Sequence, residues 1–162
     1  AELGVNKERA QELFQQYHGR VPFVKQLMDA VMKRAQDSGK IRTLLGRLCR
    51  FHLWEPNYFG IHKALPHEQA LMEHGPGIRR AYTYKALNKL IQGSAADMTK
   101  KAMIELYKSG IIPHIQVHDE LDISVKDDKE AKQIVDIMES AVELEVPNKV
   151  DYETGTNWGN IK

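Results

Sequence analysis

Residues 115–125 read Ile115-Gln-Val-His-Asp-Glu-Leu-Asp-Ile-Ser-Val125, and apolar and polar side chains alternate along them. The apolar positions are mostly β-branched, which is typical of a half-buried strand. They are Ile115, Val117, Leu121, Ile123 and Val125. Asp119 is the exception, because it stands in the apolar phase. In one straight strand its carboxylate would point into the core, which costs several kcal/mol unless a partner compensates.

Two arrangements resolve this conflict at Asp119. The strand reverses at His118-Asp119, so that the tip displays His118, Asp119 and Glu120, or the carboxylate is retained to bind a cation. Both hold if the tip is a metal site. Asp and Glu suit Mg²⁺, which commonly takes one or two carboxylates plus substrate phosphates. An ordinary solvated turn has the same composition, so the pattern by itself leaves both readings open. The histidines show no zinc-ligand spacing.

Length and composition indicate one globular domain. The chain has 162 residues, of which 42% are hydrophobic and 28% charged, as in ordinary soluble proteins. No apolar run approaches the roughly 20 residues that span a bilayer, so we expect no membrane partner. The single Cys49 excludes an internal disulfide and fits a reducing, cytoplasmic location with a buried or neutral thiol.

The charges are distributed unevenly along the chain. Residues 1–110 hold 18 Lys or Arg against 10 Asp or Glu, whereas residues 111–162 hold 5 against 12. A basic part favours a polyanionic partner, and an acidic part suits metal ligands. Solvated helix faces of opposite sign explain the same numbers.

The N-terminal third predicts two helices and a hairpin. Asn6 is suited to cap a helix over about 7–17 that Gly19 ends, and Pro22 begins a second helix that ends at Ser38-Gly39. The second helix carries an apolar stripe that predicts core packing, formed by Val24, Leu27, Met28, Val31 and Ala35. Two short strand-like runs meet at Gly46 in residues 40–51, with Arg47 and Arg50 on the second arm.

The remainder is divided by its turn residues. Residues 52–77 predict a long loop or small insertion, because Pro and Gly recur without periodicity. Residues 78–109 predict a helix pair with a break near Gln92-Gly93, a second half capped by Ser94, and an end at Gly110. A helix over about 129–144 and a strand over about 149–153 follow. We therefore expect an α+β fold with regions 1–51, 52–77 and 78–162.

Several motifs together resemble those of family A DNA polymerases. Gln116-Val-His-Asp-Glu120 is similar to the third conserved motif of that family, and Asn88-Lys-Leu-Ile-Gln-Gly-Ser-Ala-Ala-Asp97 to the helix that precedes it. Thr43-Leu-Leu-Gly-Arg47 with Arg50-Phe51 resembles the upstream arginine run, although Leu48 replaces a frequent second Arg. Order and spacing agree over essentially the whole chain. Other points of resemblance are Leu3-Gly-Val, the segment from Ala10 to Tyr17 with Pro22, Trp158, and the phage-like stretches Phe51–Pro56 and Pro76–Arg79.

The resemblance implies template-directed DNA synthesis, that is, nucleotidyl transfer from a dNTP to a primer 3′-hydroxyl. It implies part of a polymerase palm with adjoining fingers helices. Asp119 would be a catalytic carboxylate and ligand of one of two Mg²⁺ ions, with Glu120 as an auxiliary acid. His118 would contact the primer terminus. Asn88 and Gln92 would contact minor-groove acceptors, which every base pair offers.

The resemblance further implies that Arg47 and Arg50 hold backbone phosphates of the primer–template. Arg79, Arg80, Lys85 and Lys89 extend this basic surface or are simply solvated. The family's first catalytic Asp motif and its nucleotide-binding helix do not occur in the 162 residues. We therefore expect this chain to be inactive without an N-terminal polymerase portion. That portion belongs to the same gene product or to a separate chain, so an excised fragment and half of a split enzyme both remain open.

Two other functional classes fit parts of the sequence. A non-catalytic DNA-binding module would use the basic part and ignore the carboxylates. A Mg²⁺-dependent nuclease would use Asp119, Glu120 and Asp122. Under the polymerase hypothesis the expected location is the cytosol of a bacterium or of a phage-infected host, and the strand pair around 115–125 is expected to leave an exposed edge.

Overall fold

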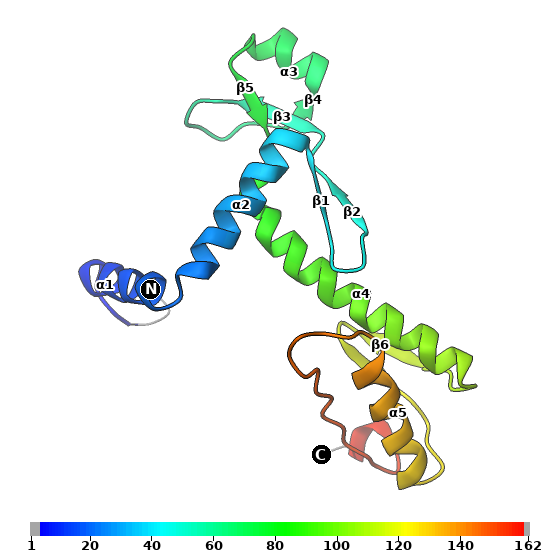
Figure 1. Ribbon diagram of the computed structural model, residues 1–162. Helices are drawn as coiled ribbons and strands as arrows, with labels where there is room; N and C mark the ends of the chain where they lie inside the picture. The colour runs from blue at the N-terminus through cyan, green and yellow to red at the C-terminus, as the bar shows by residue number, and fades with distance from the viewer. Residues whose placement is uncertain (1–3, 161–162) are drawn as a thin grey trace. The chain divides into compact units, whose positions relative to one another are not determined.

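The computed structural model describes residues 4–160 and divides the chain into two compact units, Ala1–Ile91 and Gln92–Lys162 (Figure 1). Both units combine helices with short antiparallel strands, which confirms the predicted α+β class. Helix α4, Ala86–Lys108, begins in the first unit and ends in the second. No helix in residues 4–160 has the length and apolar character needed to cross a membrane.

Two helices open the first unit, α1 at Lys7–Arg20 and α2 at Pro22–Ser38. The Asn6 side chain accepts a hydrogen bond from the Arg9 amide at 2.8 Å, as predicted for a cap. Gly19 does not end α1, because one glycine costs a helix only about 1 kcal/mol. The helix ends just before Pro22, which lacks an N–H and is suited to start the next helix.

The apolar stripe of α2 is buried at one end only. Ala35 is buried and Val31 half-buried, whereas Leu27 and Met28 are exposed, so the prediction of core packing is wrong for the first turns of this helix. The buried cluster joins the end of α2 to β1, the segment after β2 and the start of α4. It consists of Ala35, Ile41, Phe51 and Ala86, with Val31, Cys49 and Leu90 packed against it.

The predicted hairpin over 40–51 is present. Strand β1, Lys40–Arg42, pairs antiparallel with β2, Leu48–Arg50. Gly39 has φ +67° and Gly46 has φ +88°, the left-handed region in which glycine is favoured. The Phe51 amide donates to the Gly39 carbonyl at 2.8 Å and closes the base of the hairpin.

For residues 52–77 the alternative of a long loop is wrong, because residues 53–80 form a small folded element. Strands β3 (Leu53–Pro56), β4 (Leu65–Pro66) and β5 (Ile78–Arg80) pair in the order β4-β3-β5, and helix α3 spans His67–His74. Pro56 and Pro66 end their strands and Gly75 follows α3, so the residues that suggested a loop mark the element ends. Strands of two to four residues are too short to show periodicity.

The predicted helix pair over 78–109 is also corrected. After β5 and a 3₁₀ turn at Thr83–Lys85, α4 runs without a break through Gln92 and Gly93, so Ser94 lies inside the helix and not at the start of a second one. One glycine is tolerated inside a helix that packing supports. Gly110, with φ +79°, follows the helix as predicted.

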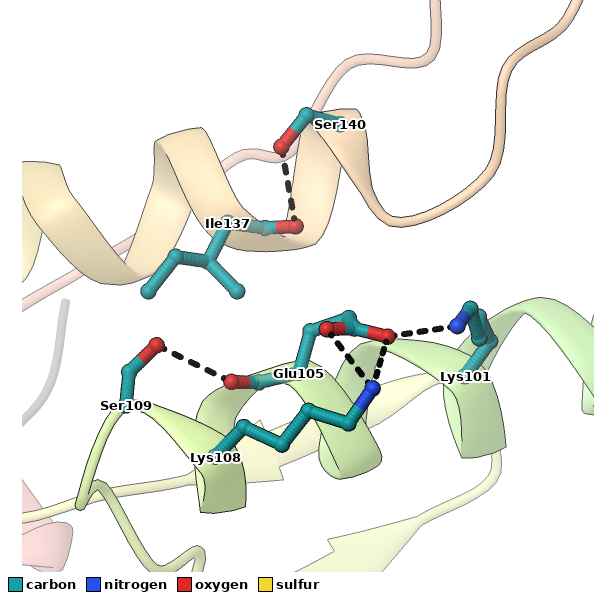
Figure 2. Close-up of polar contacts among 6 residues, drawn as sticks. All are labelled: Lys101, Glu105, Lys108, Ser109, Ile137 and Ser140. Carbon is teal, nitrogen blue, oxygen red and sulfur yellow. Dashed lines mark hydrogen bonds and ion pairs between the residues drawn. The ribbon is translucent and has the colours of Figure 1, made fainter.

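The second unit holds a two-stranded sheet and a helix. Strand β6, Ile115–Val117, pairs with β7, Glu120–Asp122, and α5 spans Asp128–Ser140. Figure 2 shows Ile137 of α5 pointing toward the last turns of α4. There hydrogen bonds from Lys101, and then from Lys108, lower the pKa of Glu105.

The predicted terminal strand at 149–153 is wrong, because no strand follows β7 within the described residues. This segment is held by a side chain of α5 in place of a sheet. The Val150 amide donates to Glu139 Oε1 at 3.0 Å, and Lys149 Nζ lies 3.1 Å from Glu139 Oε2. A 3₁₀ turn at Trp158–Asn160 follows.

Candidate functional site

The chain reverses between β6 and β7 at His118-Asp119. Val117 pairs with Glu120, so the turn consists of His118 and Asp119 alone. His118 has φ +54°, a strained conformation for a residue with a side chain. Gln116 Nε2 donates to the His118 carbonyl at 2.9 Å and braces the turn from within the hairpin. Asp119 thereby leaves the alternation of the strand and is exposed at the tip.

Two carboxylates at the tip of the β6–β7 hairpin are available to a ligand, Asp119 in the turn and Glu120 at the start of β7. Asp119 and Glu120 are exposed, and within residues 4–160 neither forms a salt bridge. A purely structural ion pair therefore does not account for Asp119. The described part of the chain has no group of three or more His, Cys, Asp or Glu side chains placed to hold a metal. The turn thus offers hard oxygen ligands but only part of a coordination shell.

The other acidic candidates have different surroundings. Asp97 is buried in α4. Asp122 is half-buried in β7 and stands opposite Ile115 in the ladder. Asp119 and Glu120 differ from these two residues, because they are neighbouring carboxylates that are both exposed.

A second group of predicted residues lies on α4. Asn88 and Gln92 are exposed and four positions apart on an unbroken helix, which places them on one face. Lys85 and Lys89 are exposed nearby in the sequence, and Lys89 Nζ lies 5.0 Å from the centre of the Phe51 ring. The continuity of α4 strengthens the prediction that the two amides act together, because a break at Gln92 would separate them.

The two predicted arginines lie in the β1–β2 hairpin. Arg47 follows Gly46 in the turn, Arg50 ends β2, and both are exposed. The Arg47 amide donates to Thr43 Oγ1 at 3.0 Å, and the Thr43 amide donates to the Arg47 carbonyl at the same distance. These bonds fix the backbone that carries Arg47.

Arg79 and Arg80 both have polar partners within residues 4–160. Arg79 Nε lies 3.0 Å from Glu55 Oε1 across the β3–β5 pair. The Arg80 guanidinium donates to the carbonyls of Gln36 and Phe51, each at 3.0 Å. It also lies over the Trp54 ring. Arg80 therefore ties α2 to the small sheet, a role that no local pattern in the sequence predicts.

The predicted site residues thus fall into three local sets: the exposed turn at His118, Asp119 and Glu120, the amide face of α4, and the arginines of the first hairpin. Of the motif residues that carried the resemblance, Leu3 lies outside the described residues.

Comparisons with known proteins agree on one family. The profile of DNA polymerase family A matches residues 1–160. A DNA-directed DNA polymerase of Pseudomonas phage M6 is 39% identical over 150 residues, which cover 93% of this chain and 19% of the relative. A DNA polymerase I of Geobacillus stearothermophilus is 33% identical over 171 residues, covering 99% of this chain and 17% of the relative.

A solved structure is similar as well. It is the POL domain of Pol1 from M. smegmatis in complex with DNA primer-template and dNTP, 30% identical with a TM-score of 0.64. The match covers 90% of this chain and 24% of that chain. The present chain therefore spans about a fifth of the length of the proteins that it resembles.

Proposed function

The chain belongs to DNA polymerase family A, and from this premise we propose that it takes part in template-directed DNA synthesis, in which a dNTP is joined to a primer 3′-hydroxyl. The observation that carries the proposal is the β6–β7 turn. It exposes Asp119 and Glu120 without salt-bridge partners among the described residues, on a backbone strained at His118. Strain that the surrounding structure maintains is frequent at functional sites.

Asp119 is the proposed ligand of a divalent metal, Mg²⁺. The fit is chemical: Mg²⁺ prefers carboxylate oxygens, keeps several waters and needs only one or two protein carboxylates beside substrate phosphates. When bound, the metal stabilises charge on the attacking and leaving oxygens of the phosphoryl transfer. Glu120 adds a second negative charge beside Asp119, and His118 presents an imidazole to the primer terminus. The further carboxylate of a two-metal site would come from outside these 162 residues.

Binding of the primer–template is the proposed role of the basic, first part of the chain. The Asn88 and Gln92 amides both donate and accept hydrogen bonds, so they can meet minor-groove acceptors regardless of sequence. Arg47 and Arg50 are proposed to neutralise backbone phosphates. The relative from M. smegmatis was solved with primer–template DNA and dNTP, which supports these partners.

A complementation assay tests the proposal. The 162-residue chain is mixed with a polypeptide that carries the upstream motifs of a family A polymerase, and primer–template, dNTPs and Mg²⁺ are added. We expect primer extension by the mixture and none by either polypeptide alone. An associated, folded pair that fails to extend the primer would contradict the proposed function.

Metal binding is tested separately on the chain itself. A Mg²⁺ titration followed by NMR should shift the amide resonances of the turn, and Asp119→Ala should abolish those shifts. Asp151→Ala is the matched control, because Asp151 is an exposed carboxylate in the C-terminal segment. Equal shifts in the wild type and Asp119→Ala would favour a DNA-binding module without catalytic metal. Shortened primers with Mg²⁺ would favour a nuclease.

A further inference from the structure

The turn before α4 displays two tyrosines on either side of a buried threonine. Tyr82 is 39% and Tyr84 66% exposed, whereas Thr83 between them is 6% exposed. Gln36 Nε2 lies 3.5 Å from Thr83 Oγ1, at the edge of hydrogen-bonding distance. Thr83 is thus packed inside, while the tyrosine on either side of it reaches the surface.

The backbone of this turn is strained in a defined way. Tyr82 has φ +61°, which is uncommon for a bulky side chain. Two hydrogen bonds hold it there: the Ala81 amide donates to the Leu53 carbonyl at 2.9 Å, and the Lys85 amide donates to the Tyr82 carbonyl at 3.0 Å. Strained conformations that their surroundings maintain are frequent at functional sites.

Lys85 joins the two rings into one element. Its Nζ lies 5.3 Å from the centre of the Tyr82 ring and 5.5 Å from that of Tyr84, within the range of cation–π attraction. Within residues 4–160, Lys85 makes no salt bridge with a carboxylate, so its charge is not neutralised there. The result is an exposed pair of aromatic rings with one cation close to both.

The element adjoins the proposed DNA-binding face. Tyr84 lies in the 3₁₀ turn directly before α4 and precedes Asn88 by four residues, which is about one helical turn. Side-chain amides form hydrogen bonds with the edges of paired bases. An aromatic ring instead needs the flat face of a base, and inside a duplex those faces are covered by neighbouring pairs. Such a ring therefore finds a partner only where the duplex ends and the template is unpaired.

We propose that Tyr82–Lys85 is a further DNA-contact element, in which Tyr84 stacks on an unpaired template base at the end of the primer–template duplex and Lys85 binds a neighbouring phosphate. The inference rests on the proposed function, because it needs DNA at the amide face of α4. It assigns the element to single-stranded template, not to the duplex that Asn88 contacts.

Affinity measurements on the full chain test the stacking contact. The dissociation constant for a labelled primer–template with a 5′ template overhang is measured by fluorescence anisotropy for the wild type, Tyr84→Ala, Tyr84→Phe and the control Tyr152→Ala. Tyr152 is an exposed tyrosine of the C-terminal segment. We expect Tyr84→Ala to weaken binding about 5- to 150-fold. Tyr84→Phe keeps the ring and should stay near wild type, as should Tyr152→Ala.

Abasic nucleotides at the first two unpaired template positions complete a double-mutant cycle. The wild type should lose on this DNA a similar factor to that lost by Tyr84→Ala on normal DNA. Combining the variant with the abasic template should cost little more. Additive losses would overturn the stacking contact, because they would mean that the ring and the base act independently.

Lys85→Gln tests the phosphate contact through the salt dependence of binding, which a purely structural role of Lys85 would leave unchanged. The slope of log K against log salt should decrease in magnitude by about 0.7 to 0.9. An unchanged slope would overturn this part of the inference. If the wild type binds no primer–template, the inference and the proposed DNA contacts fail together. If it binds and Tyr84→Ala binds equally well, only the inference fails.

Discussion

The two hairpins of this chain differ in what their apolar residues meet. In β1–β2, Ile41 is 3% exposed and packs with Phe51 in the main buried cluster. In β6–β7, Ile115 and Val117 are each 42% exposed, and all three residues of β6 are exposed. The first hairpin is supported by a core within its own unit, whereas in the second all three residues of one strand are exposed.

The turns of the two hairpins differ in a related way. Gly46 takes up the left-handed conformation of the first turn at little cost, whereas His118 takes it up in the second at the expense of strain. Stability is thus concentrated in the hairpin with the phosphate-binding candidates. Strain and exposed carboxylates are concentrated in the hairpin with the proposed chemistry. Three predictions test this contrast, and a fourth concerns the segment after α5; they run from the largest expected effect to the smallest.

The largest effect separates chemistry from binding. Asp119→Asn should lower primer extension in the complemented assay by about 1,000-fold or more, because the loss of a metal-ligating charge removes several kcal/mol of transition-state stabilisation. Arg50→Gln should weaken primer–template binding only about tenfold, the value of one charged hydrogen bond of roughly 1.5 kcal/mol. If Asp119→Asn lowered primer extension by no more than the factor by which Arg50→Gln weakens primer–template binding, the division of roles between the hairpins would be contradicted.

The second prediction compares the strands. Ile41→Ala should lower the free energy of unfolding by about 2 to 5 kcal/mol, because it leaves a cavity in the buried cluster. Ile115→Ala should lower it by less than about 1 kcal/mol, since its side chain is already partly in water. Urea denaturation of the two variants measures both values. A large loss for Ile115→Ala would show that β6 is covered.

The third prediction concerns the turns and expects effects of opposite sign. Gly46→Ala should destabilise the protein by about 1 to 2 kcal/mol, because φ +88° is unfavourable for alanine. His118→Gly should stabilise it by up to about 1 kcal/mol by relieving strain at φ +54°, while lowering primer extension. Denaturation and the complemented assay together check this. Destabilisation by His118→Gly would mean that the turn is not strained.

The smallest effect is a pH dependence at the segment that follows α5. A hydrogen bond from the Val150 amide, and then one from Lys149, lowers the pKa of Glu139 below its ordinary value of 4.5. This contact therefore stabilises the fold fully above that ordinary pKa and is lost as the pH falls through the lowered pKa. The Val150 amide resonance should titrate with a midpoint below 4.5, and Glu139→Gln should abolish the titration. A midpoint at or above 4.5 would contradict the contact.

Local signals predicted the elements that local chemistry decides. The left-handed glycines at 39, 46 and 110, the Asn6 cap and Pro22 each mark an element end that the structure contains. The misplaced Asp119 indicated a conflict that a reversal or a bound cation would resolve, because a strand cannot bury an unpaired carboxylate cheaply. The structure contains the reversal. For the candidate site, the motifs identified the residues, and the structure added that α4 is continuous and that the turn is exposed.

Long-range contacts decided what the local signals missed. The small sheet at 53–80 depends on the pairing of β3 with two distant segments and on Arg80 reaching Gln36 and Phe51. Residues 149–153 extend without a strand because Glu139 satisfies the Val150 amide in place of a ladder. The exposure of Leu27 and Met28 likewise depends on which surfaces meet, not on the periodicity of α2.

The sequence by itself determined the family, the α+β class, the two hairpin turns and the acidic tip, since each depends on residue types at fixed short spacing. Only the tertiary structure decided which apolar faces are buried, that Arg80 is a structural residue, and that Tyr82 and Tyr84 flank Lys85 at the start of α4. Burial and side-chain direction arise from contacts between residues far apart in the chain, and no pattern within one segment contains that information.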